Sequence, residues 1–297
     1  LLAAGCTRLG PDFTTPPPPV DPGWTSASLA LVPAAPRPGP WWQAFQDPAL
    51  DALLAQGLAA NPDFRIAGLR VLEARALQSA ARAGRLPQAI TATAAAGYGA
   101  SAPTAIPLGQ ADFAFGAAGL GVTWELDLWG RFARAIEGAD AGYFASIATQ
   151  EDVALLLRAE IARLYLTHRT LEERLEAVRE NVALQQRSVE ITGLRFREGD
   201  AGELDFQQAQ TQLLATQASV PGIEAGLVAT RNGLALLLGR PPGPIPELAL
   251  GPSRLPPLPA ALTLEVPAGY LLLRPDVRAA FFAAAARSTR IGIQKAE

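Results

Sequence analysis

The feature that most constrains the fold of this chain is a pair of long helical patterns separated by one short turn. Between Trp129 and Leu238, apolar residues recur at alternating steps of three and four, and the main interruption is Gly199-Asp200-Ala201-Gly202. This rhythm is typical of helices that pack along one another as a coiled coil. The first arm has about 70 residues, which corresponds to a length on the order of 100 Å. We therefore predict a long helical hairpin, far beyond the helix lengths of ordinary globular cores.

Each arm carries one seam of apolar residues, and polar residues interrupt the first seam at His168, Gln185 and Thr192. The seam comprises Ala154, Leu157, Ile161, Leu164, Leu171, Leu175, Val178, Val182, Val189 and Phe196, then Phe206, Ala209, Leu213, Thr216, Val220, Ile223, Leu227, Thr230, Leu234 and Leu237. Because His168 falls on the seam, we expect a packed structural histidine. The charged residues from Glu172 to Arg187 lie mostly off the seam and predict a solvated face.

The composition excludes several classes of function. A net charge of −3 and a pI of about 5.4 leave no basic field for nucleic acid. One cysteine excludes an internal disulfide and a cysteine metal site, and one histidine argues against a histidine metal site or a catalytic triad. Although 49% of the residues are hydrophobic, no run of about 18 apolar residues could cross a membrane as a helix. We predict no catalytic residues, no metal and no cofactor other than a lipid described below.

Residues 87–126 form a charge-poor segment unlike the helical regions. Only Asp112 is charged between Arg85 and Glu125, and small residues alternate with larger apolar ones. Two runs of about 10–14 residues fit the length of transmembrane β-strands. We predict a transmembrane hairpin whose membrane-interface aromatics are Tyr98, Phe113, Phe115, Trp124 and Trp129. Its edges must be paired by other hairpins in a closed barrel; the alternative is a soluble hairpin packed on the helices.

The helices before this segment, within residues 48–86, have clear boundary signals. Asp47-Pro48 predicts an N-cap followed by proline in the first turn. Asn61-Pro62-Asp63 predicts a break between two helices. Upstream, Trp41-Trp42 predicts a buried anchor for the terminal segment.

Two acidic residues lie where the hairpin meets the long helix. Glu125 and Asp127 could act as paired catalytic carboxylates, but no histidine or further acid lies near them in the sequence. Asp127 is better placed to cap the helix that we predict over residues 128–198.

The first residues resemble the processing site of bacterial lipoproteins. Leu1-Leu2-Ala3-Ala4-Gly5-Cys6 places a leucine and small residues before the cysteine. We expect residues 1–5 to end a signal peptide and Cys6 to carry a covalent lipid; the alternative is a chance cysteine near a frayed terminus. The proline-rich stretches within residues 6–40 predict an extended, lipid-anchored tether.

Two distant segments of the chain repeat one another. Shifting Leu271–Ala280 by 213 positions aligns it with Leu58–Ala67. The identical pairs are Leu58/Leu271, Pro62/Pro275, Asp63/Asp276, Arg65/Arg278 and Ala67/Ala280. A period this long indicates a duplicated half, not a solenoid. We predict a first repeat over residues 41–239 with long helices at 128–198 and 203–239, a connecting segment at 240–266, and the start of a second repeat at 267–297.

Several motifs occur in order over nearly the whole chain. They are Gly10-Pro11-Asp12 after the lipoprotein site, Trp41-Trp42 with Phe45-Gln46-Asp47-Pro48-Ala49-Leu50, Asn61-Pro62-Asp63, Trp124-Glu125-Leu126-Asp127-Leu128-Trp129-Gly130-Arg131, Arg195-Phe196-Arg197-Glu198-Gly199 to Glu203-Leu204-Asp205, Asn232-Gly233-Leu234-Ala235 through Leu238-Gly239-Arg240-Pro241-Pro242, and Arg274-Pro275-Asp276-Val277-Arg278-Ala279-Ala280. With these motifs the chain resembles the outer-membrane efflux proteins, the TolC-type outer membrane factors, in their NodT- and OprM-like lipoprotein branch. One departure is Phe281, where that family usually has glutamate.

The resemblance implies a mainly α fold with a β-hairpin: a long-helix α-barrel and a transmembrane β-barrel, formed by a homotrimer. It implies the exit duct of a tripartite efflux system, lipid-anchored in the outer membrane of a Gram-negative bacterium and extending into the periplasm. Drugs or other small molecules would pass through it passively. The implied partners are a periplasmic adaptor and an inner-membrane pump of the RND type. The adaptor would dock on a tip made of Gly199, Asp200, Ala201, Gly202, Leu204 and Asp205.

A complete second repeat would continue with its own hairpin and two long helices, so we expect this sequence to be cut short at Glu297 and the fragment alone to form no pore. Two other classes of protein remain as alternatives. A lipid-anchored periplasmic adaptor or structural coiled-coil lipoprotein would also carry a helical hairpin, but an adaptor should add a lipoyl-like domain. A lipid-anchored enzyme would need a convergent cluster of reactive side chains.

Overall fold

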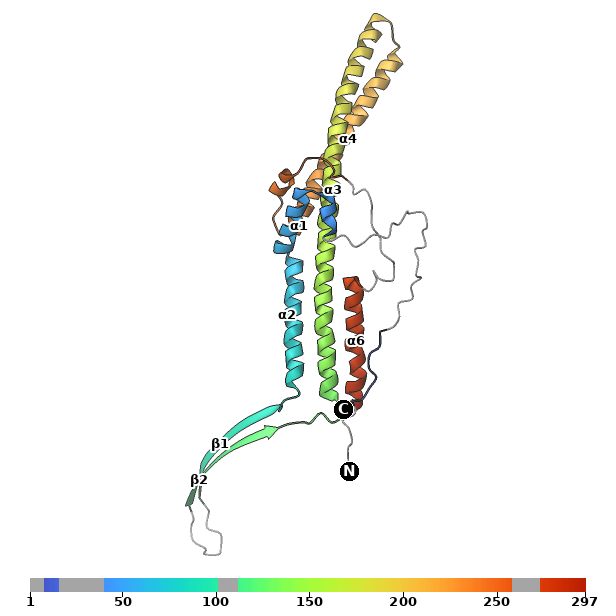
Figure 1. The fold of residues 1–297 in the computed structure, drawn as a ribbon. Helices are drawn as coiled ribbons and strands as arrows, with labels where there is room; N and C mark the ends of the chain where they lie inside the picture. Colours follow the sequence, from blue (N-terminus) through green and yellow to red (C-terminus); the bar gives the residue numbers. More distant parts are fainter. Residues whose placement is uncertain (1–7, 16–39, 101–111, 258–272) are drawn as a thin grey trace. The chain divides into compact units, whose positions relative to one another are not determined.

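The structure is a computed structural model that describes residues 8–15, 40–100, 112–257 and 273–297 (Figure 1). The chain divides into two compact units, which are described separately. Unit 1 comprises Leu1–Pro18, Leu69–Thr149 and Pro275–Glu297, and unit 2 comprises Pro19–Gly68 and Gln150–Arg274. Cys6 and most of the proline-rich segment lie outside the described residues.

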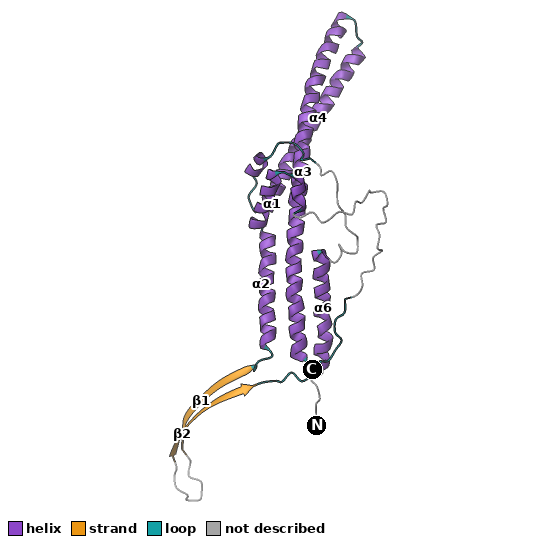
Figure 2. Ribbon diagram, in the orientation of Figure 1, coloured by secondary structure: helices purple, strands orange, loops and turns teal. Residues whose placement is uncertain are grey.

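Helices dominate, and the described strands are a single antiparallel pair (Figure 2). The elements are η1 (Trp41–Phe45), α1 (Pro48–Ala60), α2 (Pro62–Ala83), β1 (Ala89–Ala100), β2 (Asp112–Thr123), α3 (Arg131–Glu198), α4 (Glu203–Leu237), η2 (Pro246–Leu250) and α6 (Pro275–Ala296). The predicted mainly helical fold with one β-hairpin is therefore confirmed. Among the described residues, no helix combines the length and the apolar character needed to cross a membrane.

Side-chain caps set the boundaries of the first helices. Asp47 accepts hydrogen bonds from the backbone N–H groups of Ala49 and Leu50, at 2.8 and 3.3 Å, and so caps α1. At the break after α1, Asn61 accepts from the N–H of Phe64 at 3.0 Å. The same side chain donates to the carbonyl oxygen of Leu237 at 3.0 Å, which joins the break to the end of α4. Both predicted boundary signals are confirmed.

The long hairpin of α3 and α4 has the predicted seam, and the two arms lie side by side in Figure 1. All seam residues are buried or half-buried except Phe196, which is 39% exposed. Near α1, the seam residues Ile161 and Leu234 belong to the hydrophobic core of unit 2. Leu50, Leu53 and Tyr165 are members of the same core, and all five residues are fully buried. α4 continues as one helix through Pro221.

The tryptophan pair of η1 is divided between core and solvent. Trp42 packs against the core cluster, as an anchor should, and the Arg158 guanidinium lies 5.3 Å from the centre of its ring. Trp41 is 46% exposed. The predicted anchor is thus Trp42 alone, because η1 is a single 3₁₀ turn and cannot turn both rings inward.

In unit 1, the later part of α2, the first part of α3 and α6 lie side by side (Figure 1). Gln78 of α2 donates to Asp140 of α3 at 2.8 Å. On the other side, a Cβ at Gly138 would lie 2.5 Å from the hydroxyl oxygen of Thr289 in α6. α3 therefore contacts both neighbouring helices, α2 from the first repeat and α6 from the predicted second repeat.

Candidate functional site

The first candidate site is the tip where α3 reverses into α4. Gly199 has φ +82°, a left-handed conformation that glycine adopts without strain. Its N–H donates to the carbonyl of Phe196 at 3.2 Å, and the N–H of Asp200 donates to that of Arg195 at 2.8 Å. This pair of bonds is the Schellman ending of a helix. The sequence Gly-Asp-Ala-Gly thus forms a tight reversal.

The tip presents its predicted docking residues to solvent. Gly199, Asp200, Gly202, Leu204 and Asp205 are exposed, and Ala201 is half-buried. Leu204 is 68% exposed although it is apolar, which makes it the most conspicuous contact residue of the tip. Asp205 accepts a hydrogen bond from the N–H of Gly202 at 3.3 Å, so its carboxylate stabilises the start of α4. These positions suit a contact surface, and their role as a docking site stays a prediction.

An aromatic pair lies directly behind the tip. The rings of Phe196 and Phe206 stack in parallel with centroids 6.0 Å apart and an interplanar angle of 1°. Gly193 is buried beneath them, and a Cβ there would lie 3.1 Å from the Phe206 ring. Gly193 could not be recognised from the apolar pattern, because a glycine contributes nothing to such a pattern. Its signal was its position beside the seam residue Thr192, one turn before Phe196.

The second candidate site is the hairpin of β1 and β2, which we call the ribbon. Its register pairs Ile90 with Val122 and Ala92 with Leu120. Since side chains alternate across a strand, the face that carries Ile90 and Val122 has apolar residues, glycine and one tyrosine over the ten positions from Ile90 to Tyr98 and from Ala114 to Val122. This apolar face comprises Ile90, Ala92, Ala94, Ala96, Tyr98, Ala114, Gly116, Ala118, Leu120 and Val122.

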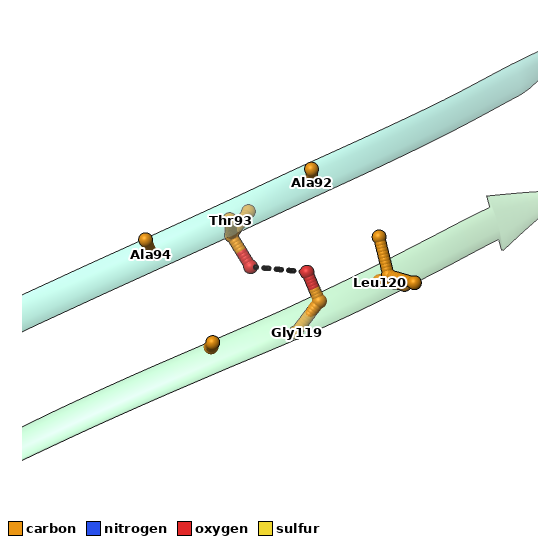
Figure 3. A pocket seen from close by; sticks show the side chains of 6 residues that line it. Ala92, Thr93, Ala94, Gly119 and Leu120 are labelled. Atoms are coloured by element: carbon orange, nitrogen blue, oxygen red, sulfur yellow. Dashed lines mark hydrogen bonds between the residues drawn. The ribbon is translucent and has the colours of Figure 1, made fainter.

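The opposite face, which we call the threonine face, is small and weakly polar. It comprises Ala89, Thr91, Thr93, Ala95, Gly97, Phe115, Ala117, Gly119, Gly121 and Thr123. Thr93 reaches across to the carbonyl oxygen of Gly119 at 3.4 Å (Figure 3), and Thr91 makes the same bond to Gly121. The Phe115 ring covers Gly97, where a Cβ would lie 2.5 Å from it. The ribbon therefore has two chemically different faces.

Neither face of the ribbon is covered by the described part of this chain. On the apolar face Leu120 is 84% exposed and Ile90 74% exposed. The threonine face is equally open, since Phe115 is 50% exposed. A soluble hairpin would bury one face on the helices, so this alternative does not fit the described residues.

The predicted interface aromatics do not form one group. Tyr98 belongs to the apolar face and Phe115 to the threonine face. Trp124 and Trp129 lie beyond the end of β2 and are 55% and 58% exposed. The Trp124 indole N–H donates to the carbonyl of Arg85 at 3.2 Å and so closes the base of the ribbon. Phe113 is paired with Gly99 in the register. The placement of these aromatics at a membrane interface stays a prediction.

The two acidic residues at the base of the ribbon have structural partners. Asp127 accepts hydrogen bonds from the N–H groups of Phe132 and Ala133 at 3.0 and 2.8 Å, so it caps α3 as predicted. Glu125 pairs with Arg131 at 2.6 Å and is 60% exposed at its side chain. No group of three or more potential metal-ligating residues occurs among the described residues.

A buried polar network holds together the core of unit 2. The Tyr165 hydroxyl donates to Asp47 and accepts from Arg169 Nε at 3.2 Å. Burial, together with the bond to Asp47, raises the pKa of Tyr165 to about 12. Arg169 also donates to the carbonyl of Leu248 and to Glu172, the latter at 2.7 Å. The network thus joins α1, α3 and η2 through one buried guanidinium that is 1% exposed.

His168 has the structural role that its seam position predicted. Its Nδ1 lies 2.8 Å from the hydroxyl of Thr230, which bridges α3 to α4. Its other ring nitrogen faces Glu172 at 3.5 Å. Burial lowers the pKa of His168, with Arg169 and Arg231 acting in the same direction and Glu172 opposing them. The neutral ring is therefore the form that packs in this seam.

Comparison with known proteins agrees with this architecture. A model of the family described as outer membrane efflux protein matches residues 53–240. SilC of Salmonella typhimurium, named a probable outer membrane lipoprotein, is 29% identical over all of this chain and 63% of its own length. TtgF of Pseudomonas putida, named a toluene efflux pump outer membrane protein, is 30% identical with the same coverage.

Solved structures give the same result. The outer-membrane channel OprN matches with a TM-score of 0.83 and 32% identity, over 97% of this chain and 64% of its own. A structure of CusC, whose title describes transmembrane channel formation, matches with a TM-score of 0.74 and 26% identity, over 97% and 63%. The chain spans 63% of the length of the relatives SilC and TtgF. With a seamed helical hairpin, a two-faced ribbon and a family match over most of its length, the chain belongs to the outer membrane efflux protein family.

Proposed function

We propose that this chain forms part of the wall of an outer-membrane exit duct, through which drugs or other small molecules leave a Gram-negative cell passively. The duct would be a homotrimer and would act with a periplasmic adaptor and an inner-membrane pump of the RND type. It would have no enzymatic activity, since its part in transport is to enclose a path. OprN and TtgF support this proposal as relatives named for a channel and an efflux pump.

The observation that carries the proposal is the open, two-faced ribbon. Its apolar face suits lipid, and its threonine face suits a water-filled interior. A hairpin by itself leaves two strand edges with unpaired backbone groups, which is unacceptable in a bilayer. Ribbons from several copies, side by side, would satisfy these edges and close a barrel. The alternating faces would then separate lipid from lumen.

The outer side of α2 supports assembly from several copies. Ala67, on one side of this helix, is buried, whereas Ile66, Leu69, Leu72 and Leu77 are between 47% and 64% exposed. Leucines at such spacing form an apolar stripe along one side of a helix. A stripe of this kind marks a contact with another protein surface. The proposed occupant is the neighbouring subunit of the duct.

The tip and the terminus would provide the remaining contacts. The exposed Leu204 supports docking of the adaptor as an apolar contact. The tight reversal at Gly199 supports it too, because glycine has no side chain and the partner's backbone could approach closely. A lipid on Cys6 would hold the chain at the membrane. SilC supports this part of the proposal, because it is named as a lipoprotein.

The test is an efflux assay with a matched pair of substitutions in adjacent residues of β2. Ala118→Arg places a charge on the apolar face and Ala117→Arg places the same charge on the threonine face. An arginine facing lipid costs about 2–4 kcal/mol near the bilayer midplane, whereas an arginine facing water costs little. In a strain that lacks its own duct, the full-length gene should restore dye and β-lactam efflux. Ala118→Arg should abolish that efflux activity, and the chain should also be lost from the outer membrane.

Ala117→Arg should leave the amount of chain in the outer membrane within about twofold of the unsubstituted chain, because the charge remains hydrated. Equal losses for the two substitutions would contradict the assignment of the faces. Failure of the unsubstituted gene to restore efflux would contradict the duct itself.

A further inference from the structure

The buried polar network around Arg169 continues along α3 to His168 and from there reaches α4. Arg169 donates to Oε2 of Glu172 at 2.7 Å. The other oxygen of this carboxylate, Oε1, lies 3.5 Å from Nε2 of His168, which is itself buried. Nδ1 of the same ring lies 2.8 Å from the hydroxyl of Thr230 in α4. One carboxylate therefore lies between a buried guanidinium and a buried imidazole.

The hydrogen bonds of Thr230 fix which ring nitrogen of His168 carries the proton. The Thr230 hydroxyl donates its one proton within α4, where the carbonyl oxygens of Gly226 and Leu227 lie at 3.0 and 3.1 Å. This hydroxyl can then only accept from His168, so the neutral ring is protonated at Nδ1. Nε2 of this tautomer presents a lone pair to the carboxylate of Glu172. A second proton, on Nε2, would turn that repulsive contact into an ion pair.

The charged groups around His168 make its second proton costly. Among the described residues, those that act on the ring are Arg169 and Glu172 of α3 and Arg231 of α4. Burial lowers the pKa of His168, Glu172 opposes this effect, and both arginines add to it, so the folded protein takes up the proton below pH 6.5. The protonated ring and Arg169 then both require the one carboxylate. Because a buried cation without its partner is strongly unfavourable, the two cations compete for Glu172.

Arg169 is also the residue that fastens η2 to α3. Its guanidinium, only 1% exposed, donates to the carbonyl of Leu248 in the middle of η2. Two further anchors lie on either side of η2. Ile245 is buried in the core of unit 2, and the N–H of Leu255 donates to Glu173 of α3 at 2.8 Å. A weaker hold by Arg169 would therefore loosen η2 locally, while the chain on both sides stays attached.

We propose that His168 is a proton-operated switch that controls how firmly η2 is held on α3. With the neutral ring, Glu172 pairs with Arg169, and Arg169 binds the carbonyl of Leu248. A proton on Nε2 draws Glu172 towards the ring, so that Arg169 loses its carboxylate partner and its bond to Leu248 weakens. The attachment of η2 thus depends on the pH of the surrounding compartment. This inference stands on the contacts within unit 2 and is independent of the duct proposed above.

Hydrogen–deuterium exchange of the purified protein in detergent tests the switch between about pH 7.5 and 5. Exchange rates are corrected for the intrinsic effect of pH and expressed as the protection of the backbone N–H groups of η2. This protection should fall at least about fivefold over the range, because local opening becomes easier. His168→Gln should abolish the fall, since glutamine does not titrate but can still donate to Thr230. Protection at the tip, residues 199–206, should not change and reports any general effect of acid.

Two arginine substitutions distinguish a switch from a merely structural contact. Arg231→Gln removes a charge that lowers the pKa of His168, so the midpoint of the fall should rise by about 0.3 pH unit or more. Arg240→Gln is the matched control, because Arg240 also holds η2, through Glu247 at 2.7 and 3.0 Å, but is not among the charges that act on His168. It should lower the protection of η2 by the same factor at both pH values and leave the midpoint unchanged.

Several results would overturn the inference. One is a protection of η2 that does not change with pH in the unsubstituted protein, and another is an equal fall in His168→Gln. A fall at the tip as large as that at η2 would show that acid opens the whole hairpin, not η2 alone. An unchanged or lower midpoint in Arg231→Gln would exclude His168 as the titrating group. This last measurement decides the question by itself if His168→Gln does not fold.

Discussion

At the scale of single residues, two buried arginines on α3 follow the same pattern. Arg134 and Arg169 are 2% and 1% exposed, and each pairs with a glutamate three residues later, Glu137 or Glu172. Each donates to backbone carbonyls outside the α-helices, those of Leu9 and Gly10 in one case and that of Leu248 in η2 in the other. Arginine suits this role because its planar fork has donors for several acceptors at once. Both residues therefore attach a segment outside the α-helices to α3.

The network around Arg169 predicts that a substitution of Asp47 strongly lowers the free energy of unfolding. Asp47→Ala removes the cap of α1 and leaves the buried Tyr165 hydroxyl without its acceptor. We expect the free energy of unfolding to fall by about 2–4 kcal/mol. Asp51→Ala is the control, because Asp51 lies in the first turn of the same helix but is exposed. Urea unfolding followed by circular dichroism in detergent measures both, and equal losses would contradict the role of Asp47.

His168 predicts a pH dependence of stability. Its folded-state pKa is lowered below the ordinary value of 6.5, so the unfolded chain binds the proton more readily. Stability is therefore fully present above pH 6.5 and is lost as the pH falls from 6.5 towards the folded-state pKa. The slope from this group cannot exceed about 1.4 kcal/mol per pH unit. His168→Gln should flatten the curve of unfolding free energy between pH 7 and 5; an unchanged slope would exclude the histidine as its source.

At the scale of elements, glycine has one role in the helical hairpin and another in the ribbon. The hairpin reverses at Gly199, where the backbone conformation itself requires glycine. In the ribbon, glycines leave room for cross-strand side chains, as at Gly97 beneath Phe115. Substitution at these glycines therefore has different costs. A Cβ on Gly199 would meet no atom within 4 Å, so the cost there comes from its left-handed backbone conformation, whereas at Gly97 it comes from a clash with the Phe115 ring.

Replacement of glycine by alanine should have opposite effects on stability at two positions of the helical hairpin. Gly199→Ala forces a left-handed residue to carry a Cβ and should destabilise the hairpin by about 1–2 kcal/mol. Gly222 lies inside α4, is exposed and has open space around its Cα. Gly222→Ala should stabilise the chain by about 0.5–1 kcal/mol, because alanine loses less conformational freedom in a helix. Thermal unfolding of both variants tests the pair, and a shift in the same direction for both would contradict it.

At the scale of the whole molecule, the described residues leave much apolar surface without cover. The open ribbon and the leucine stripe of α2 are both features of a subunit, not of a finished monomer. The relatives of this chain that form channels support that interpretation. In the proposed duct, other copies of the chain and lipid would cover these surfaces.

The leucine stripe predicts how assembly can be weakened. Leu72→Glu places a charge on the stripe, where Leu72 is 60% exposed, and should reduce the trimer fraction at least fivefold. Arg75→Glu is the control, since Arg75 is exposed on the same helix but is not part of the apolar stripe. Cross-linking in detergent followed by gel electrophoresis measures both. A trimer fraction that Leu72→Glu leaves unchanged would place the subunit interface elsewhere.

The local elements could be predicted from the sequence because their signals are local. The seam, the Gly199 reversal and the caps at Asp47 and Asp127 each involve residues within about two helical turns of one another. The alternation of β1 and β2 is equally local, so the ribbon was predicted within a few residues. The sequence predicts small residues on one side and larger apolar residues on the other, whereas the register places Phe115 and Leu120 on opposite faces of the ribbon.

The long-range contacts were decided by the tertiary structure alone. Nothing in the sequence around Arg134 or Arg169 indicates burial, since a charged residue beside a seam is normally solvated. Besides a glutamate three residues later, each has partners in the interior that come from far along the chain, the carbonyls of Leu9 and Gly10 for one and of Leu248 for the other. The sequence by itself thus determined the helices, the hairpin reversal and the strands, because backbone hydrogen bonding and hydrophobic periodicity act over short distances. Only the fold determined the contacts of Arg134 with Leu9 and Gly10 and the buried network of Arg169, because a buried charge becomes tolerable only when distant partners are already in place.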